Sequence, residues 1–339
     1  MHTLNKIIAV ILLIFILNLC SQSNPVASES SRIAGFLANY FSAFDAKPML
    51  KNISENILFT TYSSFSEKMK SLQTNCTTQN WKEAILTLRQ TEMINFGYSQ
   101  VYSNLDPWPS NYQNPTSIQS SGNHLARSEF WNICSTSIAT QIYTEAAKLA
   151  YNWNPINPSS FSVVMQTAGS SNEFYKSDKE VTDKLISSLS SILEKMKDDK
   201  IGYPAGLSTD AKNALNSGTS KTTLLNSVEY KAVSGLNIDL LKSNMSGIRK
   251  IYTGDGGVGI SAYVRYYNTG LDDRILLKMN EIDATLLSLS DLSVDINSNS
   301  AKVTTLYTQL SDFRKIFTVE LAGNLGSTFS PTSGGGDGD

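Results

Sequence analysis

The sequence predicts an all-α protein built from two packed helical bundles of the four-helix type. Apolar residues recur every three or four positions along most of the chain, as on the buried face of an amphipathic helix. No segment alternates polar and apolar residues long enough to favour a β-strand. A break with two prolines at 154–160 separates the helical stretches into two groups. We therefore expect an N-terminal bundle over 30–155 and a C-terminal bundle over 177–326.

Each predicted helix rests on an apolar stripe. The helix after the break also opens with a capping box, because Glu180 follows Ser177 by three residues. We expect irregular structure at 161–176 and 202–234, and a flexible Gly/Asp tail at 327–339. In chain order the stripes are Leu58, Tyr62, Phe65, Met69, Leu72; Ile138, Ile142, Ala146, Leu149, Trp153; Val181, Leu185, Ile192, Met196; Leu241, Met245, Ile248, Tyr252; Ile275, Met279, Ile282, Leu286, Leu289; and Val303, Leu306, Leu310, Phe313, Phe317, Leu321.

The first residues have the features of an export signal. Lys6 supplies a positive charge, and an apolar run at 7–17 follows that is too short to span a membrane comfortably. No later stretch is apolar enough to cross a bilayer. We expect residues 1–20 to be a signal peptide and the protein to be exported.

The end of this signal is similar to a lipobox, Leu17-Asn18-Leu19-Cys20, in which the cysteine would be acylated. A lipobox normally has a small residue before the cysteine, and Leu19 departs from that pattern. Cleavage near Ser21-Gln22-Ser23, which would leave a free protein, is the alternative. We expect a lipoprotein anchored to the membrane of the bacterial cell envelope through Cys20, because a cysteine that closes an apolar run in this way is uncommon by chance. Multiple acyl chains would hold such an anchor firmly.

Charge and cysteine content limit the function classes. Lys and Arg number 28 against 30 Asp and Glu, without a basic cluster, so nothing supports nucleic-acid binding. Cys76 and Cys134 would reach an oxidising compartment. They either form a disulfide, contributing about 4 kcal/mol on the chain-entropy model, or are two small buried residues.

Several short motifs follow one another along the chain. They are Trp81-Lys-Glu-Ala84, Arg89-Gln-Thr-Glu92, Asn95-Phe96-Gly97, Leu105-Asp106-Pro107-Trp108-Pro109, Arg127 with Cys134 before a helix ending at Trp153, Lys200-Ile-Gly-Tyr-Pro-Ala-Gly206, Ser227-Val-Glu229 with Ser234, Asn244-x-x-Gly247, and the terminal Asp337-Gly-Asp339. As an ordered set they resemble the imelysin family, exported bacterial helical proteins classed as metallopeptidases and often tied to iron. The resemblance extends over most of 30–339.

The family's signature, Gly-x-His-x-x-Glu, is altered in this chain. Its nearest match is Gly122-Asn123-His124, but Arg127 stands where the glutamate belongs and the nearest acid is Glu129. A spacing of three places two ligands on one helix face, whereas a spacing of five does not. His124 is therefore either a surviving ligand or a loop histidine.

The histidine count limits the possible metal chemistry. The sequence has two histidines, and His2 lies within the expected signal peptide. A zinc site with two or three histidines is thus excluded for a mature monomer. An oxygen-rich site for iron or another divalent metal remains open.

The resemblance implies one site between the two bundles, and we assign it no catalytic residue. We expect His124, Glu92 and Glu229 to be its metal ligands, although each acid has a structural alternative, such as Glu92 pairing with Arg89. The expected lining residues are Arg89, Glu92, Asp106, Trp108, His124, Arg127, Glu229 and Ser234.

These features lead to a functional prediction. We expect a non-catalytic accessory of iron or metal acquisition, in the periplasm or at the outer membrane, that works with a metal-uptake protein. Whether the chain is an enzyme stays open: the first alternative is a divergent metallopeptidase in which His124 and a carboxylate hold a metal and its water. The second is a surface scaffold that binds proteins through an exposed apolar patch.

Overall fold

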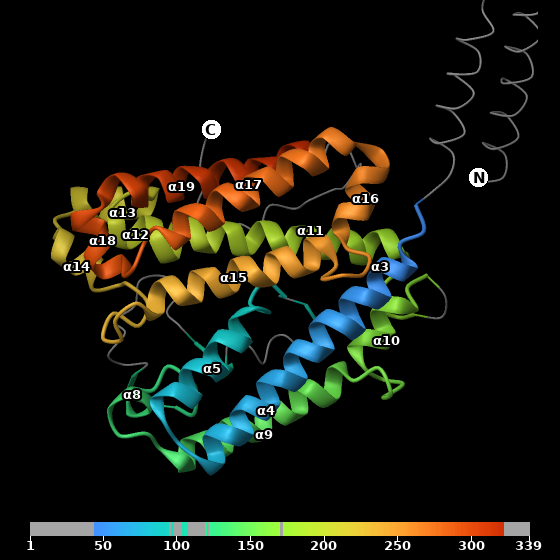
Figure 1. Cartoon of the computed structure of the whole chain (residues 1–339), viewed down its shortest axis with the longest axis horizontal. Helices are drawn as coiled ribbons and strands as arrows, with labels where there is room; N and C mark the ends of the chain where they lie inside the picture. Colours follow the sequence, from blue (N-terminus) through green and yellow to red (C-terminus); the bar gives the residue numbers. More distant parts are fainter. Residues whose placement is uncertain are drawn as a thin grey trace, which may run out of the picture. The chain divides into compact units, whose positions relative to one another are not determined.

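A computed structural model describes residues 44–94, 96–97, 104–107, 119–120, 122–169 and 172–321. Every regular element among these residues is a helix, which confirms the all-α prediction (Figure 1). None of the helices in this part of the chain has both the length and the apolar character needed to span a membrane. The predicted signal peptide, Cys20, Trp108 and the tail lie outside the described residues.

The first group of helices contains α3 (Lys47–Lys51), η2 (Asn52–Phe59), α4 (Thr60–Thr74), α5 (Thr78–Arg89), α8 (Glu129–Asn132), α9 (Thr136–Trp153) and α10 (Phe161–Gln166). The first three follow one another without a break, and α4 packs against both α5 and α9. The predicted stripe that includes Phe65 and Met69 is buried in this packing. Caps start two of the helices, since the Thr77 and Ser135 hydroxyls accept backbone N–H groups of α5 and α9.

A disulfide joins two turns of this group. Cys76 lies between α4 and α5, Cys134 lies between α8 and α9, and their Cα atoms are 5.6 Å apart. The sequence left this bridge as one of two alternatives, and the structure contains it.

The second group contains α11 (Asp178–Lys195), η4 (Met196–Gly202), α12 (Tyr203–Ala205), α13 (Thr209–Asn216), α14 (Lys221–Leu225), α15 (Leu236–Thr253), α16 (Ile260–Tyr267), α17 (Thr269–Leu287), α18 (Leu292–Ser298), α19 (Ser300–Lys315) and η5 (Ile316–Leu321). Helix α19 packs against α11 and α17, and α15 packs against α17. Ser177 caps α11 as predicted, accepting the N–H of Glu180.

The expectation of irregular structure at 161–176 and 202–234 is wrong in part. Short helices α10, α13 and α14 lie there, and each begins at a serine whose hydroxyl accepts a backbone N–H, namely Ser160, Ser208 and Ser220. These helices have five to eight residues, too few to show a clear apolar period.

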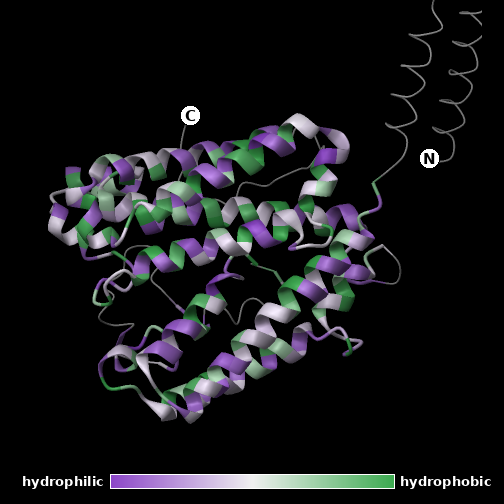
Figure 2. Cartoon of the chain, viewed as in Figure 1, coloured by the Kyte–Doolittle hydropathy of each residue, from purple (hydrophilic) through white to green (hydrophobic). Residues whose placement is uncertain are grey.

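Both groups belong to one compact unit, Ala46–Asp339. Helix α15 connects them, since it packs against α5 of the first group and α17 of the second. Most helices carry hydrophobic and hydrophilic residues on different faces (Figure 2). The end of α5 faces α15, and several buried charged residues, including Arg89, Lys200 and Glu229, lie at or near this contact.

Candidate functional site

Arg89, the last residue of α5, is the centre of a buried ion network. Its side chain is 1% exposed and contacts three carboxylates. Nη1 lies 2.9 Å from Glu92 and 3.1 Å from Glu229, and Nη2 lies 2.6 Å from Asp106. Glu92 is in the turn that follows α5, Asp106 is in a separate loop, and Glu229 lies between α14 and α15. One guanidinium thus holds three chain segments together.

Two lysines complete this network. Lys195 Nζ and Lys200 Nζ each lie 2.6 Å from a Glu92 oxygen, and Lys200 Nζ lies 3.5 Å from Glu229. The two lysines are five residues apart at the passage from α11 into the π-helical segment η4. A π-helix bonds residue i to residue i+5, so that spacing brings both ammonium groups to one side. We call Arg89, Glu92, Asp106, Lys195, Lys200 and Glu229 the Arg89 cluster; its three cations balance its three anions.

Two neutral side chains also hold the cluster. Asn244 of α15 donates to the Arg89 carbonyl and to a Glu92 oxygen, both at 2.9 Å, and accepts from Lys200 at 3.1 Å. The Tyr230 hydroxyl donates to Asp106 at 2.7 Å. The Tyr230 ring meets Trp81 and Trp131 edge-on, with centroids 5.7 and 5.8 Å apart. Aromatic rings therefore cover the Asp106 side, whereas Lys195, 34% exposed, is the member closest to solvent.

The cluster shifts the pKa values of Glu92, Lys200 and the adjoining Tyr230. Burial opposes ionisation of Glu92, but the charges of Arg89, Lys195 and Lys200 outweigh it and hold the pKa of this carboxyl well below its usual value. Burial, reinforced by Arg89, lowers the pKa of Lys200 against the opposing pull of Glu229 and Glu92. Burial and the neighbouring Asp106 raise the pKa of Tyr230 well above its usual value, so this hydroxyl remains a donor at neutral pH.

The low pKa of Glu92 predicts a defined loss of stability in acid. A carboxyl whose pKa is lower in the folded than in the unfolded state stabilises the fold above the unfolded value, about 4.3, and loses that contribution as the pH falls below it. Urea midpoints measured from pH 7 down to pH 3 should therefore fall more steeply for the wild type than for Glu92→Gln. Equal slopes for the two proteins would contradict this assignment.

Gly247 lets α15 approach the end of α5. A Cβ built on Gly247 would lie 2.0 Å from the Gln90 carbonyl oxygen, so this part of the Asn244-x-x-Gly247 motif needs the missing side chain. Asn244, one turn earlier, makes its bond to the Arg89 carbonyl from the same helix. Asn244 and Gly247 thus have complementary roles in one motif, since the asparagine bonds to the end of α5 and the glycine lets α15 come close enough for that bond.

Gly247→Ala should therefore destabilise the protein by about 1–3 kcal/mol, the usual cost of overpacking. Gly270→Ala is the matched control, because a Cβ on this exposed α17 glycine meets only Asn268, at an ordinary 3.6 Å. The control should be neutral or stabilise by up to about 1 kcal/mol. In urea unfolding, Gly247→Ala should lower the free energy of unfolding and Gly270→Ala should not, and an equal decrease in both variants would contradict the close approach.

The structure brings four of the eight predicted site residues together: Arg89, Glu92, Asp106 and Glu229. Arg127 instead pairs with Glu129 and donates to the Gly122 carbonyl at 2.9 Å. Ser234 donates to Asp291 at 3.0 Å, in a separate network at the start of α15.

His124 is buried at 7% exposure in the turn before α8. The next residue, Leu125, donates its N–H to the Leu105 carbonyl and accepts from the indole of Trp81. The backbone bond between Leu125 and Leu105 thus places His124 near the loop that carries Asp106.

Two of the three predicted metal ligands, Glu92 and Glu229, face cations in this structure. Across the described residues, no three or more His, Cys, Asp or Glu side chains are grouped so that they could hold one. The oxygens of Glu92 and Glu229 already face Arg89, Lys195 and Lys200. A cation placed there would have to displace positive charges from a buried and balanced network, which is strongly unfavourable.

Four members of the site escaped the sequence prediction. Lys200 and Asn244 occur in the family-like motifs, and Tyr230 adjoins Glu229, so proximity to a motif was the available signal. Lys195 carries no such signal, because its role depends on the π-helical turn that follows it.

Comparison with known proteins assigns the chain to a family. The family model described as imelysin matches residues 119–316, more than half of the chain. An imelysin-like protein from Psychrobacter arcticum has a similar structure, with a TM-score of 0.62 and 15% identity over 85% of this chain and 99% of that one. A putative iron-regulated protein A precursor from Parabacteroides distasonis gives a TM-score of 0.58 and 14% identity over 80% of this chain and 95% of that one. No curated protein matches. The ordered motifs, the all-α fold and the family model agree, and the chain belongs to the imelysin family.

Proposed function

We propose that this protein is a non-catalytic accessory of iron or other metal acquisition, exported to the bacterial cell envelope and anchored there through Cys20. The observation that carries the proposal is the closed charge balance of the Arg89 cluster. Its three carboxylates are each paired with a cation, and Asn244 and Tyr230 fill further positions around them. A metallopeptidase needs open ligands and an activated water, and this arrangement favours holding segments together instead.

The iron link comes from the family and from one relative of similar fold. The Parabacteroides distasonis protein carries the description of a putative iron-regulated protein A precursor. We propose that iron or another metal is cargo for this chain rather than a resident cofactor. The protein would handle the metal together with a metal-uptake partner protein. The altered signature around His124 supports the same reading, because Arg127 and Glu129 neutralise one another there.

A deletion strain grown under iron limitation tests the proposal. Accumulation of ⁵⁵Fe should fall in the deletion, return with the wild-type gene, and stay low with Cys20→Ser, which removes the acylation site. His124→Ala should restore uptake as well as the wild type does. Unchanged ⁵⁵Fe accumulation in the deletion would contradict the acquisition role.

A peptidase assay on the purified protein separates the catalytic alternative. We expect the protein to show no chelator-sensitive hydrolysis of unfolded protein substrates. Chelator-sensitive hydrolysis lost in His124→Ala, and retained in the matched control Arg274→Met on the surface, would replace this proposal with a divergent metallopeptidase.

A further inference from the structure

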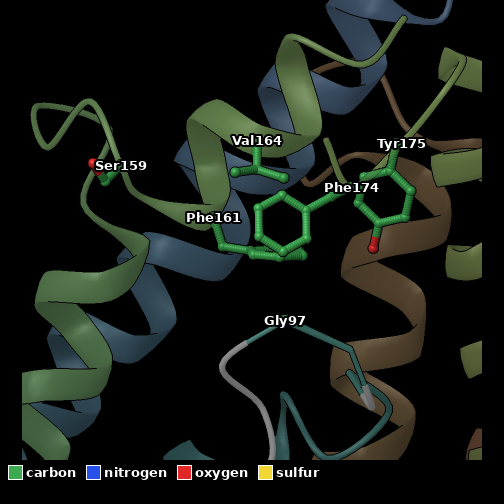
Figure 3. A pocket seen from close by; sticks show the side chains of 6 residues that line it. All are labelled: Gly97, Ser159, Phe161, Val164, Phe174 and Tyr175. Carbon is green, nitrogen blue, oxygen red and sulfur yellow. The ribbon is translucent and has the colours of Figure 1, made fainter. Parts of the chain in front are cut away.

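A second site candidate lies away from the Arg89 cluster, at a cavity of about 300 Å³ beside α10. It shares no residue with that cluster. Its walls come from Gly97 after α5, from the turn and first residues of α10, and from the connection between α10 and α11 (Figure 3). The lining residues are Gly97, Ser159, Phe161, Val164, Phe174 and Tyr175.

The aromatic floor of this cavity is built by buried packing. Phe161 is 5% exposed, and its ring centroid lies 5.3 Å from that of Trp153 and 6.2 Å from those of Phe174 and Tyr175. Gly97 has a φ of +66°, and a Cβ there would lie 2.7 Å from the Phe161 ring. Glycine therefore satisfies both the backbone conformation and the close approach.

One polar group faces this aromatic space. Tyr175 is 7% exposed, and its hydroxyl points to the side on which Gly97 lies (Figure 3). Burial, with a smaller contribution from Glu180, raises the pKa of Tyr175 to about 12, so the group keeps its proton at neutral pH. A protonated hydroxyl is a hydrogen-bond donor, so it can bind an acceptor atom of a ligand that enters this space.

The lining also specifies the charge and size of a ligand. None of the six residues carries a charge, so an ion would lose its hydration without gaining a counter-charge. Phe174 is 66% exposed and leaves an aromatic edge at the mouth. An engineered apolar cavity of about 150 Å³ already takes up benzene, and natural ligand pockets begin near about 300 Å³.

We propose that this cavity binds a small neutral aromatic molecule, with its ring against Phe161 and Phe174 and a hydrogen-bond acceptor on the Tyr175 hydroxyl. Edge-to-face and offset contacts with the two phenylalanines supply the preference for an aromatic ring. The hydroxyl fixes which end of the molecule enters, as single polar groups do in mostly apolar pockets.

The probe is 4-fluoroacetophenone, a neutral aromatic ketone, titrated into the full chain and followed by ¹⁹F NMR. Saturable binding should weaken about two- to tenfold in Tyr175→Phe, which removes only the hydroxyl, and by a similar factor in Phe174→Ala. Val164→Trp, which fills the cavity, should abolish binding. Tyr151→Phe and Leu287→Ala, exposed residues outside the lining, are the controls and should bind as the wild type does.

Two further compounds test the ligand class: cyclohexyl methyl ketone should displace 4-fluoroacetophenone only at a several-fold higher concentration than unlabelled acetophenone does, and 4-fluorobenzoate should not bind. Near-ultraviolet circular dichroism of each variant confirms that it is folded. No saturable binding of the ketone, or binding that persists unchanged in both Val164→Trp and Tyr175→Phe, would overturn the site. Neither result bears on iron accumulation, so this inference and the acquisition role fail separately.

Discussion

Arg89→Met is expected to destabilise the protein by about 3–5 kcal/mol, the usual effect of breaking a buried ion pair from one side. Without the guanidinium, Asp106 loses its cation and retains the hydrogen bond from the Tyr230 hydroxyl. Glu92 still pairs with Lys195 and Lys200, and Glu229 with Lys200. Buried carboxylates without a paired cation carry most of this cost. Urea unfolding at pH 7 measures it.

The matched control is Arg274→Met. Arg274 also pairs with a carboxylate, Glu320 at 2.5 Å, but its side chain is exposed, so its loss should cost at most about 1 kcal/mol. A second step tests the network itself: adding Asp106→Asn to Arg89→Met should restore part of the lost stability, because the unpaired charge is then removed. Equal small effects at Arg89 and Arg274 would contradict a buried network.

Replacing Cys76 and Cys134 together with serine is expected to cost about 4 kcal/mol on the chain-entropy model, since the bridge closes a loop with a sequence separation of 58. The bridge connects the α4–α5 turn to the α8–α9 turn, and α4 packs against both α5 and α9. Its loss should therefore lower the urea midpoint of the whole compact unit.

Cys20→Ser provides the comparison for this bridge, because that cysteine is no part of it and its loss should leave the midpoint unchanged. Thiol counting gives an independent check. The unreduced, unfolded Cys20→Ser protein should react with no maleimide, whereas two reactive thiols in it would contradict the disulfide.

The long helices were predictable because each buries one face. Trp153 and Leu321, the last residues of two predicted stripes, are fully buried. Apolar residues spaced three or four positions apart are expected to line one buried face of a helix. The short helices α13 and α14, which Ser208 and Ser220 cap in the structure, were not predicted, because five to eight residues are too few to show an apolar period. For such elements the cap is the stronger signal.

The site was predictable where the contact is local or follows a motif. Arg89 and Glu92 meet because they are three residues apart at the end of one helix. Glu229 was predicted from the family resemblance alone. Its ion pair with Arg89 joins residues 140 positions apart, and no local pattern in the sequence reveals such a contact. Lys195 could not be predicted, because a π-helical turn changes which residues share a face and apolar periodicity does not reveal it.

Metal titration of the purified protein decides whether the Arg89 cluster is a structural ion network or a metal centre. Fe(II), Fe(III) and Zn(II) are titrated by calorimetry into the wild type, Glu92→Gln and Glu229→Gln, with elemental analysis of each protein as isolated. A structural network predicts no stoichiometric metal in the isolated protein and no heat that depends on either glutamate. One equivalent of bound metal that both substitutions weaken, in proteins that remain folded, would show instead that the cluster opens to take up a cation.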